Sequence, residues 1–287
     1  MNNFSLIGAA IDACAGTVGS KDTPYIINEK IKPSLTFKEI LDYTSTGKDL
    51  PQIRTYFTKL ATLTKHTLNE QKTPIIIGGD HSCAIGSWSG ISDYLNDNNQ
   101  NLGLIWIDAH MDSHTFETSP SGNIHGMPIA ALLGHGSSEL TTILNNSNKI
   151  DPQNIILIGI RSYEDGEAEL LKKLGVKIYY NHDLHKENIN SLIHKSWNEL
   201  DQRVDKIGFS IDLDGFDPLF APGVGTREPD GVNFNEFLMC IKELDLTKLI
   251  GVEITEGNQH LDQTEQTMDC IIKLIGEFTK YGTKKSC

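Results

Sequence analysis

Nearly continuous hydrophobic runs recur along this chain, separated by segments in which the hydrophobic positions have helical spacing. Continuous runs, as opposed to alternating ones, are typical of strands that are buried on both faces of a parallel sheet. The pattern predicts strands over residues 4–11, 74–77, 103–107, 154–160, 176–180, 206–211 and 249–254.

Segments with the helical period lie between these strands. In the first of them, Ile53, Phe57 and Leu60 share one face, and Pro51 suits the first helical turn. Helices are predicted over residues 50–70, 84–95, 127–133, 168–174, 189–200, 234–244 and 263–280, whereas residues 20–50 show no clear period. Strands that alternate with helices predict a doubly wound, mainly parallel sheet covered on both faces. No repeat or long linker divides the chain, so we expect one domain over residues 1–287.

Acidic and histidine side chains follow several of the predicted strands, and ligands of such sheets bind at the carboxyl ends of the strands. On extended backbone, residues at every second position face one side, which would apply to Asp108, His110 and Asp112. Asp212 and Asp214 have the same spacing. A polar loop would explain one such triplet equally well. Converging carboxylates need counter-charge, however, and a pair of hard divalent cations such as Mn²⁺ would supply it.

The composition narrows the choice of partners and compartment. A net charge of −13 argues against nucleic acid or an anionic membrane as a partner. It suits a cationic substrate, although solubility alone would also explain it. The five cysteines lack paired spacing, which argues against a disulfide framework or a zinc ribbon. That cysteine usage fits a reducing cytoplasm, so we expect a cytoplasmic protein, and no hydrophobic run approaches transmembrane length.

Three motifs in order and spacing resemble those of the ureohydrolase family, and within it the arginases: Gly78-Gly-Asp-His-Ser82, Asp108-Ala-His-Met-Asp112 and Ser210-Ile-Asp-Leu-Asp-Gly-Phe-Asp-Pro218. The resemblance implies a three-layer α/β/α sandwich around a mainly parallel, eight-stranded sheet. It also implies a homo-oligomer, commonly a trimer or hexamer. Two Mn²⁺ ions are implied, and Co²⁺ or Ni²⁺ would accept the same ligands. The first ion would be held by His81, Asp108, Asp112 and Asp212, and the second by His110, Asp108, Asp212 and Asp214.

The resemblance also implies the chemistry of the site. Members of the family use the two ions to activate water for attack on a guanidinium carbon. Glu256 matches the carboxylate that holds the guanidinium group, and His125 matches a loop histidine that moves protons. The ligand Asp112 is counted with these two as a catalytic residue.

The other end of the substrate is expected to contact a loop. Ser121 and Asn123 match residues of bacterial arginases that bind the α-carboxylate, and Thr226 matches one at the guanidinium end. His114 stands where arginases carry Asn, and Glu164 where they carry Asp near the α-amino group. Residues 227–231 also depart from the arginase pattern. We therefore predict hydrolysis of L-arginine to L-ornithine and urea, with another guanidino compound (a guanidino acid or agmatine) as the alternative substrate. A catalytically silent metal-binding scaffold is the alternative from another class.

Overall fold

One parallel sheet forms the centre of the molecule. The computed structural model describes residues 3–32, 35–45, 47–184 and 186–282. Within these ranges eight strands pair in the order β2-β1-β3-β8-β7-β4-β5-β6, and each neighbouring pair is parallel. The strands are β1 (Phe4–Ala10), β2 (Phe37–Asp42), β3 (Thr73–Gly78), β4 (Leu102–Ile107), β5 (Ile155–Ile160), β6 (Lys177–Tyr180), β7 (Lys206–Asp212) and β8 (Leu249–Thr255). The predicted mainly parallel sheet is confirmed.

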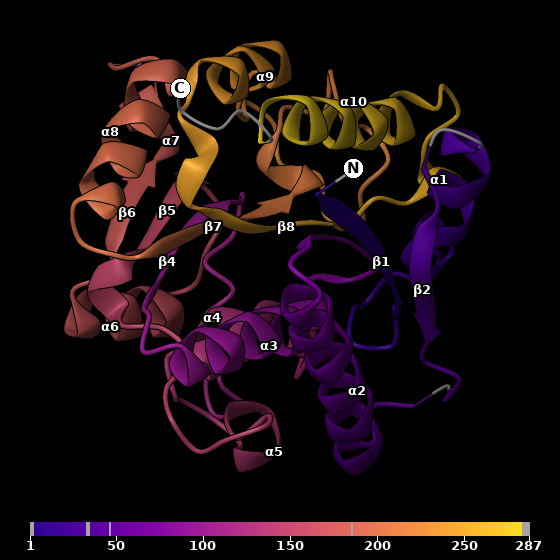
Figure 1. Cartoon of the computed structure of the whole chain (residues 1–287), viewed down its shortest axis with the longest axis vertical. Coiled ribbons are helices and arrows are strands. Elements are labelled where there is room, and N and C mark those ends of the chain that lie inside the picture. The colour runs from indigo at the N-terminus through magenta and orange to yellow at the C-terminus, as the bar shows by residue number, and fades with distance from the viewer. Residues whose placement is uncertain (1–2, 33–34, 46, 185, 283–287) are drawn as a thin grey trace.

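Helices cover both faces of this sheet. In the view of Figure 1, α1, α8, α9 and α10 lie above it, and α2, α3, α4 and α6 lie below it. The helices are α1 (Thr23–Ile31), α2 (Leu50–Asn69), α3 (Ala84–Asp97), α4 (Pro128–Leu132), α5 (Ser138–Thr141), α6 (Asp165–Leu174), α7 (Asn181–Leu184), α8 (Ile189–Asp201), α9 (Phe234–Glu243) and α10 (Gln266–Tyr281). The three-layer α/β/α sandwich is therefore also confirmed.

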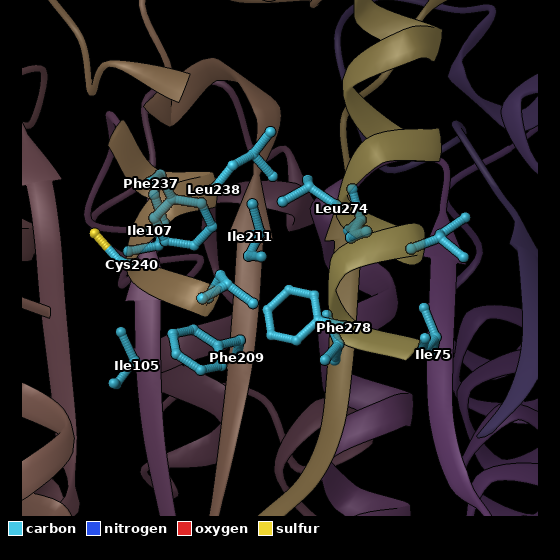
Figure 2. Packing of buried hydrophobic residues seen from close by; sticks show 14 of the residues in the cluster. Ile75, Ile105, Ile107, Phe209, Ile211, Phe237, Leu238, Cys240, Leu274 and Phe278 are labelled. Atoms are coloured by element: carbon cyan, nitrogen blue, oxygen red, sulfur yellow. The ribbon is translucent and has the colours of Figure 1, made fainter. Parts of the chain in front are cut away.

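Aromatic side chains pack helices from both faces of the sheet against the central strand β7. On the upper face the ring of Phe209 lies 6.3 Å from that of Phe237 on α9 and 5.5 Å from that of Phe278 on α10 (Figure 2). On the other face Trp88 of α3 approaches so closely that a Cβ on Gly208 would lie 2.3 Å from its ring. Such close packing resists local deformation, so the end of β7 has a well-defined position.

Two departures from the predicted elements have simple physical causes. Residues 20–50 contain α1 and β2, neither of which was predicted. Strand β2 is an edge strand whose side chains are half-buried or exposed, so it lacks the continuous hydrophobic run of a central strand. Helix α6 begins at Asp165, earlier than predicted, because Glu164 and Glu167 form a capping box that satisfies its first backbone amides.

Two expectations from composition can be compared with the described part of the chain. None of the helices there is both long and hydrophobic enough to cross a membrane. Cys14, Cys83, Cys240 and Cys270 are buried free thiols, whereas Cys287 lies outside the described residues.

Candidate metal centre and substrate pocket

Four neighbouring strands bring the predicted site residues together. Strands β3, β8, β7 and β4 are adjacent in the sheet and parallel, so their carboxyl ends meet at one edge. Each is followed by a segment that carries site residues: His81 after β3, Glu256 after β8, Asp212 and Asp214 at the end of β7, and Asp108, His110 and Asp112 after β4. The candidate site is the carboxyl edge of the sheet, as predicted.

The first group of potential ligands surrounds one ring nitrogen. His81 Nδ1 lies 3.3 Å from Asp108 Oδ2, 3.0 Å from Asp112 Oδ2 and 3.0 Å from Asp212 Oδ2. All four residues are buried. Ligand atoms of these residues lie close enough together to hold one metal ion.

A second group lies beside it and shares one carboxylate with it. His110 Nδ1 lies 3.5 Å from Asp108 Oδ1 and 3.2 Å from Asp214 Oδ2. Asp108 therefore presents one oxygen to each group. Ligand atoms of Asp108, His110 and Asp214 are also close enough together to hold one metal ion. By the same criterion Asp212 belongs to the first group and not to the second.

The polar atoms of the first group fit a bound cation. His81 Nδ1 and Asp112 Oδ2 are buried, and neither has a hydrogen-bond partner among the described residues, although they lie only 3.0 Å apart. Buried polar atoms without a partner are rare in folded proteins. Lone pairs that face a common cation would produce such an arrangement. Because oxygen ligands with imidazole suit Mn²⁺, Co²⁺ and Ni²⁺, the residues present fit a divalent metal centre.

Local turns, not strand alternation, orient these ligands. The extended-backbone explanation for Asp108, His110 and Asp112 was wrong, because β4 ends at Ile107 and Asp112 has a φ of 44°. Asp108 Oδ1 instead accepts a hydrogen bond from His110 N at 2.7 Å. Asp212 Oδ1 accepts one from Asp214 N at 2.8 Å in the same way. Short side-chain-to-backbone turns of this type hold a carboxylate in a fixed position.

Glu256 and His125 form a pair next to the first group. Glu256 has a φ of 63°, a left-handed conformation that is uncommon for a residue with a side chain and often marks a functional site. Its Oε1 accepts a hydrogen bond from His81 N at 2.8 Å and lies 3.2 Å from His125 Nδ1. Burial opposes the charge on His125, but the hydrogen bond and charge of Glu256 outweigh it and raise the pKa of His125 to about 9. His125 therefore carries a proton at neutral pH.

A cavity of about 320 Å³ opens above the ligand groups. Five predicted substrate residues line it: His114, Ser121, Asn123, Glu164 and Thr226. His110, Asp112, His125, Asp212 and Asp214 line it as well. Its volume suits a small molecule, and the cavity joins the potential metal centre to the loop that was predicted to hold the far end of a substrate.

Two residues near this loop were missed from the sequence. Glu167 lines the cavity, lies 3.4 Å from His114 Nε2, and accepts a hydrogen bond from Ser113 N at 3.1 Å. Burial raises the pKa of Glu167 to about 8. The sequence did offer a signal for Glu167: it stands three residues after Glu164, the spacing of a capping box. Lys48 donates a hydrogen bond to Asn123 Oδ1. Lys48 belongs to the segment without a period, so no local pattern pointed to it.

This arrangement is that of an α/β protein with a candidate site at the carboxyl edge of a parallel sheet. A sequence model described as the Arginase family matches residues 2–280. The chain belongs to the arginase family.

Individual relatives agree with this assignment. Arginase from Bacillus caldovelox is 39% identical over 227 residues, which cover 79% of this chain and 74% of that protein. Arginase from Bacillus subtilis (strain 168) is 38% identical over 218 residues, covering 76% and 72%. A crystal structure of arginase from Bacillus subtilis superposes with a TM-score of 0.86 at 32% identity and covers 99% of both chains. The similarity thus extends over the sheet and the site together.

Proposed function

We propose that this chain hydrolyses L-arginine to L-ornithine and urea, using two divalent cations at the carboxyl edge of the sheet. The observation that carries the proposal is the pair of ligand groups that share Asp108 beneath a cavity of small-molecule size. The first ion would be held by His81, Asp108, Asp112 and Asp212, and the second by His110, Asp108, Asp212 and Asp214. When bound, the ions supply the Lewis acidity that makes water a nucleophile at neutral pH.

The guanidinium group would bind to Glu256. One oxygen of this carboxylate, Oε1, is already held by His81 N and His125 Nδ1. The other oxygen, Oε2, lies toward the segment of Thr226, since a Cβ on Gly225 would be 3.9 Å from it. Pairing with a carboxylate held in this way would orient the planar cation for attack at its central carbon.

His125 would move protons at the same place. It carries a proton at neutral pH and lines the cavity, so it can give that proton to the departing amine. Its contact with Glu256 keeps it next to the guanidinium group, and the exposed part of its ring can recover a proton from solvent.

The α-amino and α-carboxylate groups would contact the loop after β4 and the start of α6. Ser121 and Asn123 can donate hydrogen bonds to a carboxylate, and His114 can add a third only by giving up its contact with Thr118 or Glu164. Glu164 can accept one from an ammonium group, and Glu167 lies next to it. The hydrogen bond between His114 Nε2 and Glu164 Oε2, 3.0 Å long, places the two departures from the arginase pattern in direct contact.

The remaining assignments extend the proposal. We take Mn²⁺ as the ion, with Co²⁺ or Ni²⁺ as substitutes, because oxygen and imidazole ligands accept all three. We also take residues 1–287 as one domain of a cytoplasmic homo-oligomer, a trimer or hexamer by resemblance to arginases. Light scattering after size-exclusion chromatography measures the oligomeric state directly.

A panel of guanidino substrates tests the proposal. Urea release would be measured with L-arginine, agmatine and 4-guanidinobutyrate after the protein is loaded with each metal in turn. The proposal expects L-arginine to have the highest kcat/KM and Mn²⁺ to support turnover. A higher value for agmatine or guanidinobutyrate would support the alternative substrate class, which would account for the changes at His114, Glu164 and residues 227–231. No urea from any of them would refute the proposal.

A further inference from the structure

A carboxylate that none of the roles above involves lies buried behind the first ligand group. Glu253 on β8 is 0% exposed, and four side chains donate hydrogen bonds to it. Trp88 Nε1 and Ser210 Oγ donate to its Oε2 at 2.9 and 2.8 Å. Ser87 Oγ and Cys83 Sγ donate to its Oε1 at 2.5 and 3.5 Å. An ionised carboxylate only accepts hydrogen bonds, so four converging donors match the charged form of Glu253.

One of these donors connects Glu253 to the metal ligand His81. Ser210 Oγ lies 3.0 Å from His81 Nε2. A serine hydroxyl has one proton, which Ser210 gives to Glu253, so Ser210 must accept the proton of His81 Nε2. The proton of a neutral His81 ring is therefore on Nε2, and the lone pair is on Nδ1. Nδ1 is the atom that faces the three carboxylates of the first group.

The ring of His81 is held in plane as well as in tautomer. It stacks on the indole of Trp106, with ring centroids 4.3 Å apart and planes 19° apart. Trp106 Nε1 in turn donates to Asp108 Oδ2 at 2.8 Å. The ring therefore cannot rotate freely, and the hydrogen bond at Nε2 determines how well Nδ1 can act as a ligand.

A negative charge on the buried Glu253 side chain also requires a compensating positive charge nearby. Within the described ranges of the chain, neither Lys nor Arg forms an ion pair with Glu253; the basic group that lies near it is His81 Nε2, at 4.0 Å. An isolated charge away from water is costly unless it is hydrogen-bonded and compensated. A cation bound at His81 Nδ1 would provide the compensation through the imidazole and the Ser210 hydroxyl.

We propose that Glu253 is a positioning residue for the metal ion next to His81, acting through Ser210. The chain Glu253–Ser210–His81 sets the tautomer of the imidazole and increases the electron density on Nδ1, as hydrogen-bonded carboxylates do for histidine ligands of metals. This inference rests on the proposed function in one respect: it requires that the two ligand groups hold ions.

The second group provides an internal comparison. His110 belongs to that group only, and its side chain is 23% exposed. Its other ring nitrogen, Nε2, lies 3.9 Å from Glu228 Oε1, too far for a hydrogen bond. Breaking the hydrogen bonds that connect Glu253 through Ser210 to His81 should therefore weaken the binding of one ion, whereas a general loss of structure would weaken the binding of both.

The test uses Glu253→Gln and Ser210→Ala in the full chain. Glutamine keeps the shape of Glu253 and removes its charge, and alanine removes the hydroxyl that connects the two residues. Bound Mn²⁺ would be counted after dialysis, and each affinity would be measured by chelator competition. We expect roughly 10- to 100-fold weaker binding of one ion, so that the count falls from two to one, with little change in the other. The electron paramagnetic resonance spectrum should change from that of a coupled pair to that of a single ion.

Two further variants separate positioning from packing. Ser87→Ala removes a donor to the same carboxylate without breaking the connection to His81, so both affinities should stay as in the parent. Ser210→Thr keeps the hydroxyl and should retain most of the affinity that Ser210→Ala loses. If Glu253→Gln does not fold, the two Ser210 variants carry the test by themselves.

The outcomes distinguish this inference from the proposed function. If Ser210→Ala and any folded Glu253→Gln bind two ions as the parent does, Glu253 has no positioning role. Equal weakening of both ions, or an equal effect of Ser87→Ala, would show that the cluster only supports the fold. A parent protein that binds no pair of ions would instead refute the proposed function.

Discussion

The two ends of the cavity are built differently. At the metal end the ligands lie at strand ends or in tight turns, and five of the six are at most 6% exposed. At the amino-acid end His114 is buried, but Ser121 is exposed, Asn123 is half-buried, and the side chain of Glu164 is 61% exposed. Buried groups that share hydrogen bonds and charge cannot change singly, whereas loop residues can change at little cost to the fold. Under the proposed function, the metal end would therefore set the class of chemistry, and the amino-acid end would select the substrate.

The largest effect is expected at the shared ligand. Asp108→Asn keeps the side chain's shape but removes the charge from both groups, so metal content and activity should fall together. A loss of several kcal/mol of electrostatic stabilisation corresponds to on the order of 10³-fold or more in kcat. Metal analysis and urea release check this. The control is Asp97→Asn, since the side chain of Asp97 is 63% exposed on α3. An Asp108→Asn protein with two ions and full turnover would contradict the shared-ligand assignment.

The next effect is at the junction between the two ends. His125→Ala should retain its metal and lose roughly 10²- to 10⁴-fold in kcat, because a general acid is removed. Added imidazole should restore part of the rate. His66→Ala on α2, where the side chain is 62% exposed, is the matched control. Unchanged turnover in His125→Ala would remove the proton-transfer role.

The same residue predicts a pH dependence. Glu256 raises the pKa of His125 to about 9, so the proton is held below that pH and lost above it. The contribution of His125 as a proton donor should be complete near neutral pH and decline as the pH rises through about 9. The kcat profile of the parent should show this decline, and the profile of His125→Ala should not. The same alkaline decline in both proteins would assign it to another group.

A smaller effect is expected from the substrate's carboxylate. Agmatine has none, and would lack the hydrogen bonds that Ser121 and Asn123 can donate to the carboxylate of arginine; hydrogen bonds to a charged group are worth about 1.5–3 kcal/mol each. The kcat/KM for L-arginine should exceed that for agmatine at least about tenfold, since about 1.4 kcal/mol is a factor of ten. Ser121→Ala combined with Asn123→Ala should reduce this ratio by acting on arginine alone. A ratio that the double variant leaves unchanged would place the carboxylate elsewhere.

The smallest effect is expected from a single change on the loop. His114→Asn restores the usual arginase residue and removes the hydrogen bond to Glu164. Arginine turnover should be preserved or improved, and the metal content should not change. Steady-state kinetics with arginine and 4-guanidinobutyrate measure the shift in preference. A loss of bound metal in this variant would mean that the two ends are coupled more tightly than their separation in the fold indicates.

Much of the architecture follows from local patterns in the sequence. Central strands such as β4 and β7 are buried on both faces, so their hydrophobic runs are continuous and easily recognised. Strand β2 has no continuous hydrophobic run, because it lies at the edge of the sheet and its side chains are half-buried or exposed. Helix α1 was missed beside it, since the hydrophobic positions of residues 20–50 have no consistent period.

By itself, the sequence determined which side chains are candidates for the chemistry, because the ligand and loop motifs have a recognisable composition and follow predicted strands. Only the tertiary structure decided how they meet. The order of β3, β8, β7 and β4 in the sheet is not their order in the chain, and the turn at Asp112 depends on a left-handed backbone. The contacts of Lys48 with Asn123 and of Trp88 with Glu253 join residues 75 and 165 positions apart. Such contacts leave no local pattern, because their free energy comes from packing and burial that exist only in the folded chain.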